Sequence, residues 1–317
     1  MMKLISQEYS RNSITPLFFE IEIIERYFKN PKYDINYTDY RGSINIKSEY
    51  LKNDGTEEYE LIKDFGLAYH KETDRRAIVC FAGDIVRLSE KAQLLWQSFL
   101  IEKQDDYQMN EGFYKNLIKG QWVDNISIYQ ALLMEIHYIN QMSLAMGIPE
   151  FFVIEYDYSS NQYKERPLHF HNVLFPTRDN YYNFINTLEK LIISNINYKS
   201  FTVDTSIIKK IDPIKEDGYM KGTLMMMEEW LTQNIHGGDI IEDIIKPLKG
   251  LRKVRQKPAH ELYENEYNEE IWNDQRKLMH SVYSAVRNIR LNFGNHPLSK
   301  QVEIDSILFN GTNIVDY

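Results

Sequence analysis

The sequence predicts an α+β fold, with a mixed α/β N-terminal module followed by a helical C-terminal part. Two patterns indicate this class. Runs rich in β-forming residues are concentrated before residue 175, and four successive segments after residue 179 carry apolar residues at helical spacing. A length of 317 residues suffices for two domains. We therefore expect an α+β module over residues 1–175 and a helix bundle with a C-terminal tail over residues 176–317.

The first elements are predicted to be strands with one short helix. Residues 1–30 carry an apolar stripe between glutamates that suits a strand passing into a helix, although the two periods mix and leave the choice open. Residues 31–50 are rich in Asn, Asp, Tyr and Gly, which favours loop and edge-strand structure. Runs of β-forming residues on both sides of Lys71–Asp74 predict a hairpin over residues 59–88.

The middle of the chain combines two helices with two short strands. A helix over residues 89–100 has Ser89 as a suitable N-cap, and a longer helix over residues 126–146 ends at Gly147. Strands are predicted over residues 151–154 and 167–175. The second strand carries His169 and His171, which would face the same side and could share a metal ion. Polar residues on a solvent-facing strand explain the two histidines as well, because no third ligand is evident.

Four amphipathic helices are predicted in the C-terminal part, which is the number that a helix bundle needs. They cover residues 179–197, 224–235, 239 to about 257, and 269–293. Pro247 and Gly250 are expected to kink the third helix. The fourth has Gln275 as the one polar member of its apolar stripe, and its Arg287 and Arg290 are expected to be surface charges near the C-terminal end. The tail from residue 296 is expected to form a final strand or extended segment.

The charge of the protein is distributed unevenly. A net charge of −9 argues against a surface that binds nucleic acid non-specifically. Nevertheless, residues 246–257 contain six Lys or Arg residues and no Asp or Glu. Any RNA contact must therefore be local to this stretch. The candidate RNA-binding residues are Lys249, Arg252, Lys253, Gln256 and Lys257, although ordinary surface charge explains Arg252 and Lys257 equally well.

Arg255 and His260 are the candidate catalytic residues. A guanidinium group offers a planar, permanently charged fork to a phosphate oxygen, and an imidazole titrates near neutral pH and can transfer a proton. Pro258 lacks an N–H and disfavours helical geometry at Lys257, so the helix is expected to stop or kink there and to let His260 turn back towards Arg255. The alternative is a solvated basic helix end, favoured by the helix dipole.

The segment Arg255-Gln256-Lys257-Pro258-Ala259-His260 resembles the R-x4–6-H signature of HEPN domains, which are small helical bundles found in many prokaryotic defence ribonucleases and toxins. The family often has a polar residue after the Arg and Ala before the His, and Gln256 and Ala259 fit. The resemblance covers about residues 179–294. It implies metal-independent RNA cleavage by 2′-hydroxyl attack, with Arg255 and His260 as catalytic residues, a cyclic-phosphate product and a homodimer.

The resemblance leaves other properties open. A related group of HEPN toxins has a modified Tyr two residues after the His, whereas Tyr263 lies one residue too far, so that regulation is not inferred. The N-terminal module resembles no family and would serve in sensing or regulation, with a regulatory protein as a possible partner. The alternative to an enzyme is a non-catalytic HEPN-like scaffold that binds nucleic acid or a protein.

Several other functions lack their sequence signals. The chain has no G-x-x-x-x-G-K-[ST], G-x-G-x-x-G or G-x-S-x-G motif, which argues against a P-loop, a Rossmann cofactor site and a hydrolase elbow. Cys80 is the single cysteine and lies in an apolar run, so a buried, inert thiol is expected. No apolar run approaches the ~20 residues of a membrane span, and the N-terminus lacks a signal-peptide core. We expect a cytoplasmic protein without membrane contact or cofactor.

Overall fold

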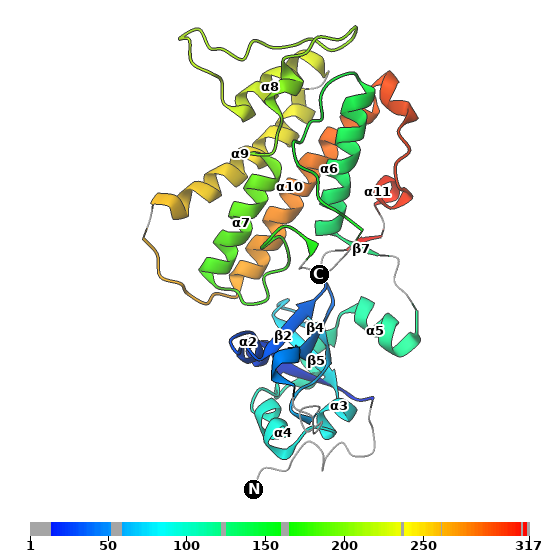
Figure 1. Cartoon of the computed structure of the whole chain (residues 1–317), viewed down its shortest axis with the longest axis vertical. Coiled ribbons are helices and arrows are strands. Elements are labelled where there is room, and N and C mark those ends of the chain that lie inside the picture. Colours follow the sequence, from blue (N-terminus) through cyan, green and yellow to red (C-terminus); the bar gives the residue numbers. More distant parts are fainter. Residues whose placement is uncertain are drawn as a thin grey trace. The chain divides into compact units, whose positions relative to one another are not determined.

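The computed structural model describes residues 14–51, 59–121, 125–159, 165–235, 238–260, 262–311 and 313–315, with only the backbone of residues 257–260. The chain forms two compact units, the first reaching to Asn125 and the second beginning at Ile126 (Figure 1). The expected boundary at residues 175/176 is therefore too late. The reason is helix α6 (Ile128–Ala145), which packs against α10 (Glu270–Gly294) and belongs to the helical core.

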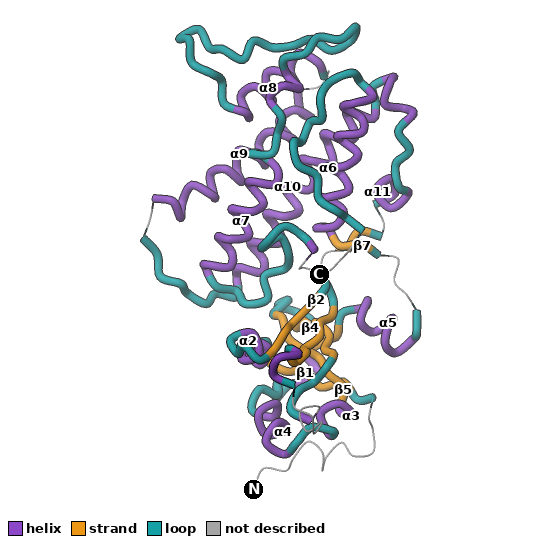
Figure 2. The backbone as a smooth tube through the Cα atoms, viewed as in Figure 1, coloured by secondary structure: helices purple, strands orange, loops and turns teal. Residues whose placement is uncertain are grey.

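The first unit is built on an antiparallel sheet (Figure 2). Its strand order is β1-β5-β4-β3-β2, and β6 pairs with β4. The expected hairpin is confirmed, because β4 and β5 pair antiparallel on either side of the turn at Lys71–Asp74. Asp74 adopts a φ of 57°, which Asp tolerates better than most residues. The strands are β1 (Pro16–Glu20), β2 (Tyr33–Tyr37), β3 (Arg41–Ile46), β4 (Asp64–His70), β5 (Arg76–Phe81) and β6 (Tyr107–Met109).

Short helices accompany this sheet. Residues 1–30 contain a strand followed by a helix where the structure describes them, namely β1 and α2 (Glu22–Phe28). Helix α3 (Ala82–Val86) follows β5 directly. Ser89 caps α4 (Glu90–Gln97) as expected, since its Oγ accepts a hydrogen bond from Ala92 N at 3.3 Å. Helix α5 (Glu111–Lys119) places the Phe113 ring directly over Gly66 of β4, where a Cβ atom would clash.

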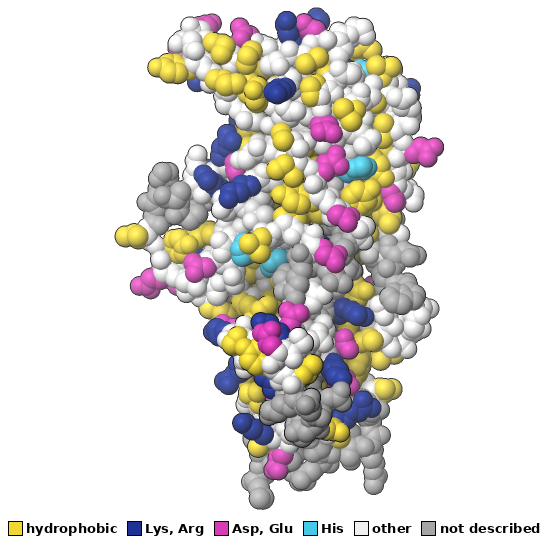
Figure 3. Space-filling model, in the orientation of Figure 1, with side chains coloured by type: hydrophobic (Ala, Val, Ile, Leu, Met, Phe, Trp, Pro, Cys, Tyr) yellow, Lys and Arg dark blue, Asp and Glu magenta, His cyan; other side chains and the backbone are white. Residues whose placement is uncertain are grey.

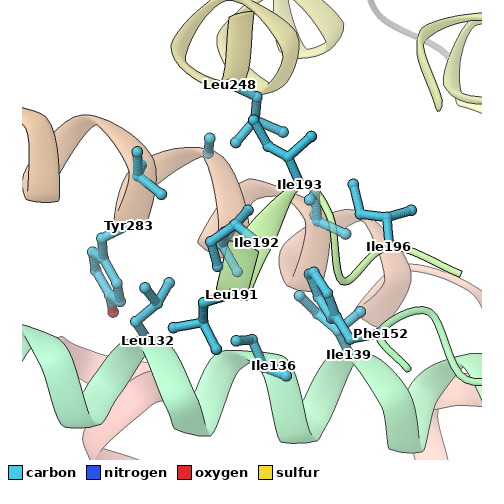
Figure 4. Packing of buried hydrophobic residues seen from close by; sticks show 14 of the residues in the cluster. Leu132, Ile136, Ile139, Phe152, Leu191, Ile192, Ile193, Ile196, Leu248 and Tyr283 are labelled. Atoms are coloured by element: carbon cyan, nitrogen blue, oxygen red, sulfur yellow. The ribbon is translucent and has the colours of Figure 1, made fainter. Parts of the chain in front are cut away.

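The second unit is a helical bundle around one large apolar core (Figure 4). The four helices expected after residue 179 are present, and α6 contributes an additional apolar face. Leu132, Ile136 and Ile139 of α6 face Leu191 and Ile192 across this core. The described helices are α6, α7 (Arg178–Ile192), α8 (Thr223–Asn234), α9 (Gly238–His260), α10 and α11 (Ser306–Asn310). In the tail, β8 (Ile314–Val315) pairs in parallel with β7 (Ile126–Ser127).

The two strands predicted at residues 151–154 and 167–175 are wrong. The first segment forms only an isolated bridge between Phe152 and Ile196, and Asn140 makes hydrogen bonds to both the N–H and the C=O of Phe152. In the second, His169 adopts a left-handed φ of 68°, and the backbone of Val173 bonds to α10. Gln275 Oε1 accepts from Val173 N at 3.0 Å, and Trp272 Nε1 donates to Val173 O at 2.9 Å. The polar residue in the apolar stripe of α10 therefore anchors this irregular segment.

A buried ion pair connects α6 and α10. Arg290 donates from Nε to Glu135 at 2.6 Å and from Nη2 to the other carboxylate oxygen at 3.1 Å. Both side chains are almost inaccessible to solvent, at 3% and 0% exposure. The expectation that Arg290 is a surface charge is thus wrong. Its partner lies 155 residues earlier in the chain, on a helix that sequence patterns assigned to the other domain.

Candidate functional site

Helix α9 carries the whole basic stretch. Ile244, Ile245, Leu248 and Leu251 form its buried stripe, while Lys253, Arg255 and Gln256 are exposed. Figure 3 shows Lys and Arg side chains gathered along this helix. The alternation arises because apolar residues recur every three or four positions and cations occupy the intervening ones. One helix therefore anchors the bundle and presents positive charge.

Ion pairs neutralise some of these cations. Lys249 Nζ lies 2.7 Å from a carboxylate oxygen of Glu228 on α8. Arg252 Nη2 lies 3.7 Å from Glu189 on α7. Within the part of the chain that the structure describes, Lys253 and Arg255 have no ion-pair partner. Among the candidate catalytic and RNA-binding residues whose side chains are described, the cations without an ion pair are therefore Lys253 and Arg255, near the C-terminal end of the helix.

The backbone does not bend Arg255 and His260 towards each other. Helix α9 continues through Pro258 to His260, whereas the sequence predicted a break there. A proline removes one helical hydrogen bond, at a cost of about 3 kcal/mol, but the neighbouring turns of α9 are retained. On a continuous helix, positions five apart are separated by about 140° around the axis and about 7.5 Å along it. The two positions thus lie on different sides of α9.

The structure does not describe the side chains of residues 257–260. The candidate residues Lys257 and His260 are among these four. What the structure describes is the helical backbone that carries them. Of the predicted catalytic pair, Arg255 alone has a described side chain, and it is exposed.

Sequence reasoning missed a groove beside the basic face. It lies between α7, α9 and α10 and has a volume of about 710 Å³. Tyr181 and Tyr182 line it from α7, Lys246 and Gly250 from α9, and Lys277 from α10. Burial raises the pKa of the Tyr181 phenol above its usual value, so the ring stays uncharged. No local signal marks this groove in the sequence, because it exists only through the packing of three helices.

The histidines of the predicted metal site do not share a strand face. His169 lies in a turn, and His171 Nδ1 lies 2.9 Å from the carbonyl oxygen of Asn172. Among the described residues, no cluster of three or more His, Cys, Asp or Glu side chains is arranged to hold a metal ion. Cys80 is buried as expected, and this burial raises the pKa of its thiol well above the usual value.

Comparisons of the chain with models of protein families, with curated proteins and with solved structures gave no match. Among the residues that the structure describes, no helix is long and apolar enough to cross a membrane.

Proposed function

We propose that the protein is a metal-independent endoribonuclease of the HEPN type, acting in the cytoplasm in a phage-defence or toxin-like role. The observation that carries the proposal is the combination of the R-x4-H motif with uncompensated positive charge at the same end of α9. Lys253 and Arg255 are exposed there and lack ion pairs among the described residues. A helical bundle that presents the motif on a basic helix is also what the HEPN resemblance implies.

In the proposed chemistry, histidine transfers protons and arginine stabilises negative charge. His260 takes the proton of a ribose 2′-hydroxyl, and the resulting oxygen attacks the adjacent phosphorus. Arg255 stabilises the extra negative charge on the phosphorane through its planar fork. The bond from phosphorus to the 5′-oxygen breaks, and that oxygen takes up a proton from a protonated histidine. The products end in a 2′,3′-cyclic phosphate and a 5′-hydroxyl.

The separation of positions 255 and 260 around α9 favours a site that is shared between two chains. Positions 255 and 260 lie about 140° apart around α9, so they are on different sides of one helix. We place Arg255 of one chain next to the His260 of a second copy, so that a two-fold symmetric homodimer contains two composite sites. The N-terminal sheet unit is then a sensing or regulatory module that binds a regulatory protein partner.

The continuous course of α9 through Pro258 to His260 favours a second candidate function. If the continuous helix keeps Arg255 and His260 apart in the assembled protein as well, α9 can still bind phosphates without cutting RNA. The protein would then be a HEPN-like scaffold that binds nucleic acid or a partner.

Cleavage of a fluorescent mixed-sequence RNA in the presence of EDTA tests the proposal. The wild type should yield cyclic-phosphate ends, and His260→Ala should lower the rate by on the order of 10²–10⁴-fold while the thermal melting profile stays the same. Wild-type rates in a folded His260→Ala protein would exclude the nuclease and leave the scaffold.

Mixing two inactive chains tests the composite site. Random pairing of Arg255→Ala with His260→Ala chains makes half of the dimers mixed, and each mixed dimer has one complete site of two. The mixture should therefore recover about a quarter of the wild-type activity. No recovery in a mixture whose subunits are shown to exchange would mean that each site uses both residues of one chain.

A further inference from the structure

The groove between α7, α9 and α10 combines aromatic, apolar and cationic surfaces. A volume of about 710 Å³ is in the range of sites that hold a small organic molecule, the size class of a nucleotide. The apolar part of the wall includes Leu251, Val254 and Ile271. Such a lining gains free energy when it covers a flat, weakly polar ring, because water leaves both surfaces.

Aromatic side chains form the α7 wall. The rings of Tyr181 and Tyr182 have an interplanar angle of 26° and centroids 6.3 Å apart. Tyr263 supports Tyr182 in an edge-on contact, with a centroid distance of 4.7 Å and an angle of 85°. Rings held in this manner are stacking surfaces that lose little rotational freedom when a base binds, and every nucleic-acid base has a face that can stack.

Two lysines stand on the opposite walls. Lys277 of α10 is exposed and has no ion pair within the described residues, and Lys246 of α9 has a weak surface contact of 3.5 Å with Glu242. Two other charged groups line the groove, but Arg178 is engaged with Glu266 at 2.6 Å, and Asp274 is the one acidic side chain of the lining. A bound base has a phosphate on each side along the chain, and the two walls of the groove each supply one lysine for these phosphates.

We propose that this groove is a base-binding site, in which an unpaired RNA base stacks against the Tyr181–Tyr182 wall and its flanking phosphates contact Lys246 and Lys277. This inference rests on the proposed function and adds a recognition site away from Arg255 and His260. It requires an unpaired base, because bases within a duplex are stacked on their neighbours and do not offer a free face. The groove therefore directs the enzyme to single-stranded or looped RNA.

A substitution at Gly250 can fill the groove without disturbing the fold. It lies on α9 in the groove wall, and a Cβ atom added there would meet no atom within 4 Å. Gly250→Leu places a branched side chain in the groove, whereas Gly250→Ala adds one methyl group and leaves the space open. Both substitutions replace a residue of low helix propensity by a better one, so both proteins should melt at or above the wild-type temperature.

The test is binding of a short single-stranded 2′-O-methyl RNA, which cannot be cut by 2′-hydroxyl attack. Gly250→Leu should weaken binding by on the order of 10-fold, the scale for losing one stacked base, and Gly250→Ala should bind like the wild type. Tyr182→Leu should weaken binding and Tyr182→Phe should preserve it. A duplex of the same sequence should bind more weakly than the single strand and should be insensitive to Gly250→Leu.

Each other outcome overturns the inference. Wild-type affinity in Gly250→Leu, equal losses in Gly250→Leu and Gly250→Ala, or no binding of the probe by the wild type would each show that no base occupies the groove. Cleavage of unmodified RNA is scored separately. Wild-type binding by a Gly250→Leu protein that still cuts RNA would refute the groove and leave the nuclease, whereas groove-dependent binding without any cutting would refute the nuclease and leave the groove.

Discussion

In the proposed function, the ion pairs on α9 determine which of its cations contribute to RNA binding, and two lysines provide a matched comparison. Lys253 is exposed without an ion pair among the described residues, whereas Lys249 lies 2.7 Å from Glu228. A cation that contacts a phosphate releases counterions, which contributes about 0.7 to the slope of log affinity against log salt for a single strand. Lys253→Gln should therefore reduce the slope by roughly 0.7. Lys249→Gln should change it little, because Glu228 already compensates that charge.

The double variant Lys253→Gln/Arg255→Gln enlarges the effect. Two lost phosphate contacts should lower the slope by about 1.4, which corresponds to roughly 7-fold less loss of affinity over a four-fold rise in salt. The assay is fluorescence anisotropy of a labelled single-stranded 2′-O-methyl RNA, titrated at several salt concentrations. Equal slopes for Lys249→Gln and Lys253→Gln, or an unchanged slope in the double variant, would refute the reasoning that ion pairing selects the binding cations.

Two further predictions concern stability. Glu135→Leu leaves the Arg290 guanidinium buried with the carbonyl of Leu308 at 3.4 Å as its remaining described acceptor. Urea unfolding should therefore show that the free energy of unfolding falls by about 3–5 kcal/mol, and Glu135→Leu/Arg290→Met should recover most of this loss. A loss below about 1 kcal/mol would contradict this prediction. Burial lowers the pKa of His296, and its Nδ1 accepts a hydrogen bond from Leu298 N at 3.3 Å. The neutral imidazole therefore stabilises the folded state at neutral pH, and this stabilisation is lost as the pH falls below the unfolded-state pKa. His296→Asn keeps a capping oxygen without titrating, and melting temperatures between about pH 8 and pH 5 should fall less steeply for this variant than for the wild type.

The elements that the sequence predicted well are those whose cause is local. The stripes of α7 to α10 could be predicted because each helix shows its own apolar period, and Ser89 caps α4 through a bond three residues away. The hairpin of β4 and β5 likewise depends on adjacent residues.

The failures arise where the partner is distant. Residues 151–154 and 167–175 have the composition of strands, but their backbone groups bond to side chains such as Asn140 and Gln275. Likewise, the apolar stripe of α6 predicts a helix without showing which unit it joins, and the domain boundary was misplaced for that reason. Pro258 lowers the probability of a helix at that position, yet the backbone of α9 continues to His260.

The acidity of the protein has a role in the proposed function. Glu228 and Glu189 neutralise Lys249 and Arg252, so among the described side chains of α9 Lys253 and Arg255 carry positive charge without an ion pair. Lys277 adds a cation at the neighbouring groove that has no ion pair with any described residue. In the proposed function, an RNA strand is attracted to these cations, while the excess of negative charge elsewhere on a protein with a net charge of −9 repels it. In the proposed function, binding of a base needs the groove of one chain, whereas cutting needs Arg255 and His260 from two chains. We therefore expect α9 to hold RNA in the monomer and to cut it only in the dimer.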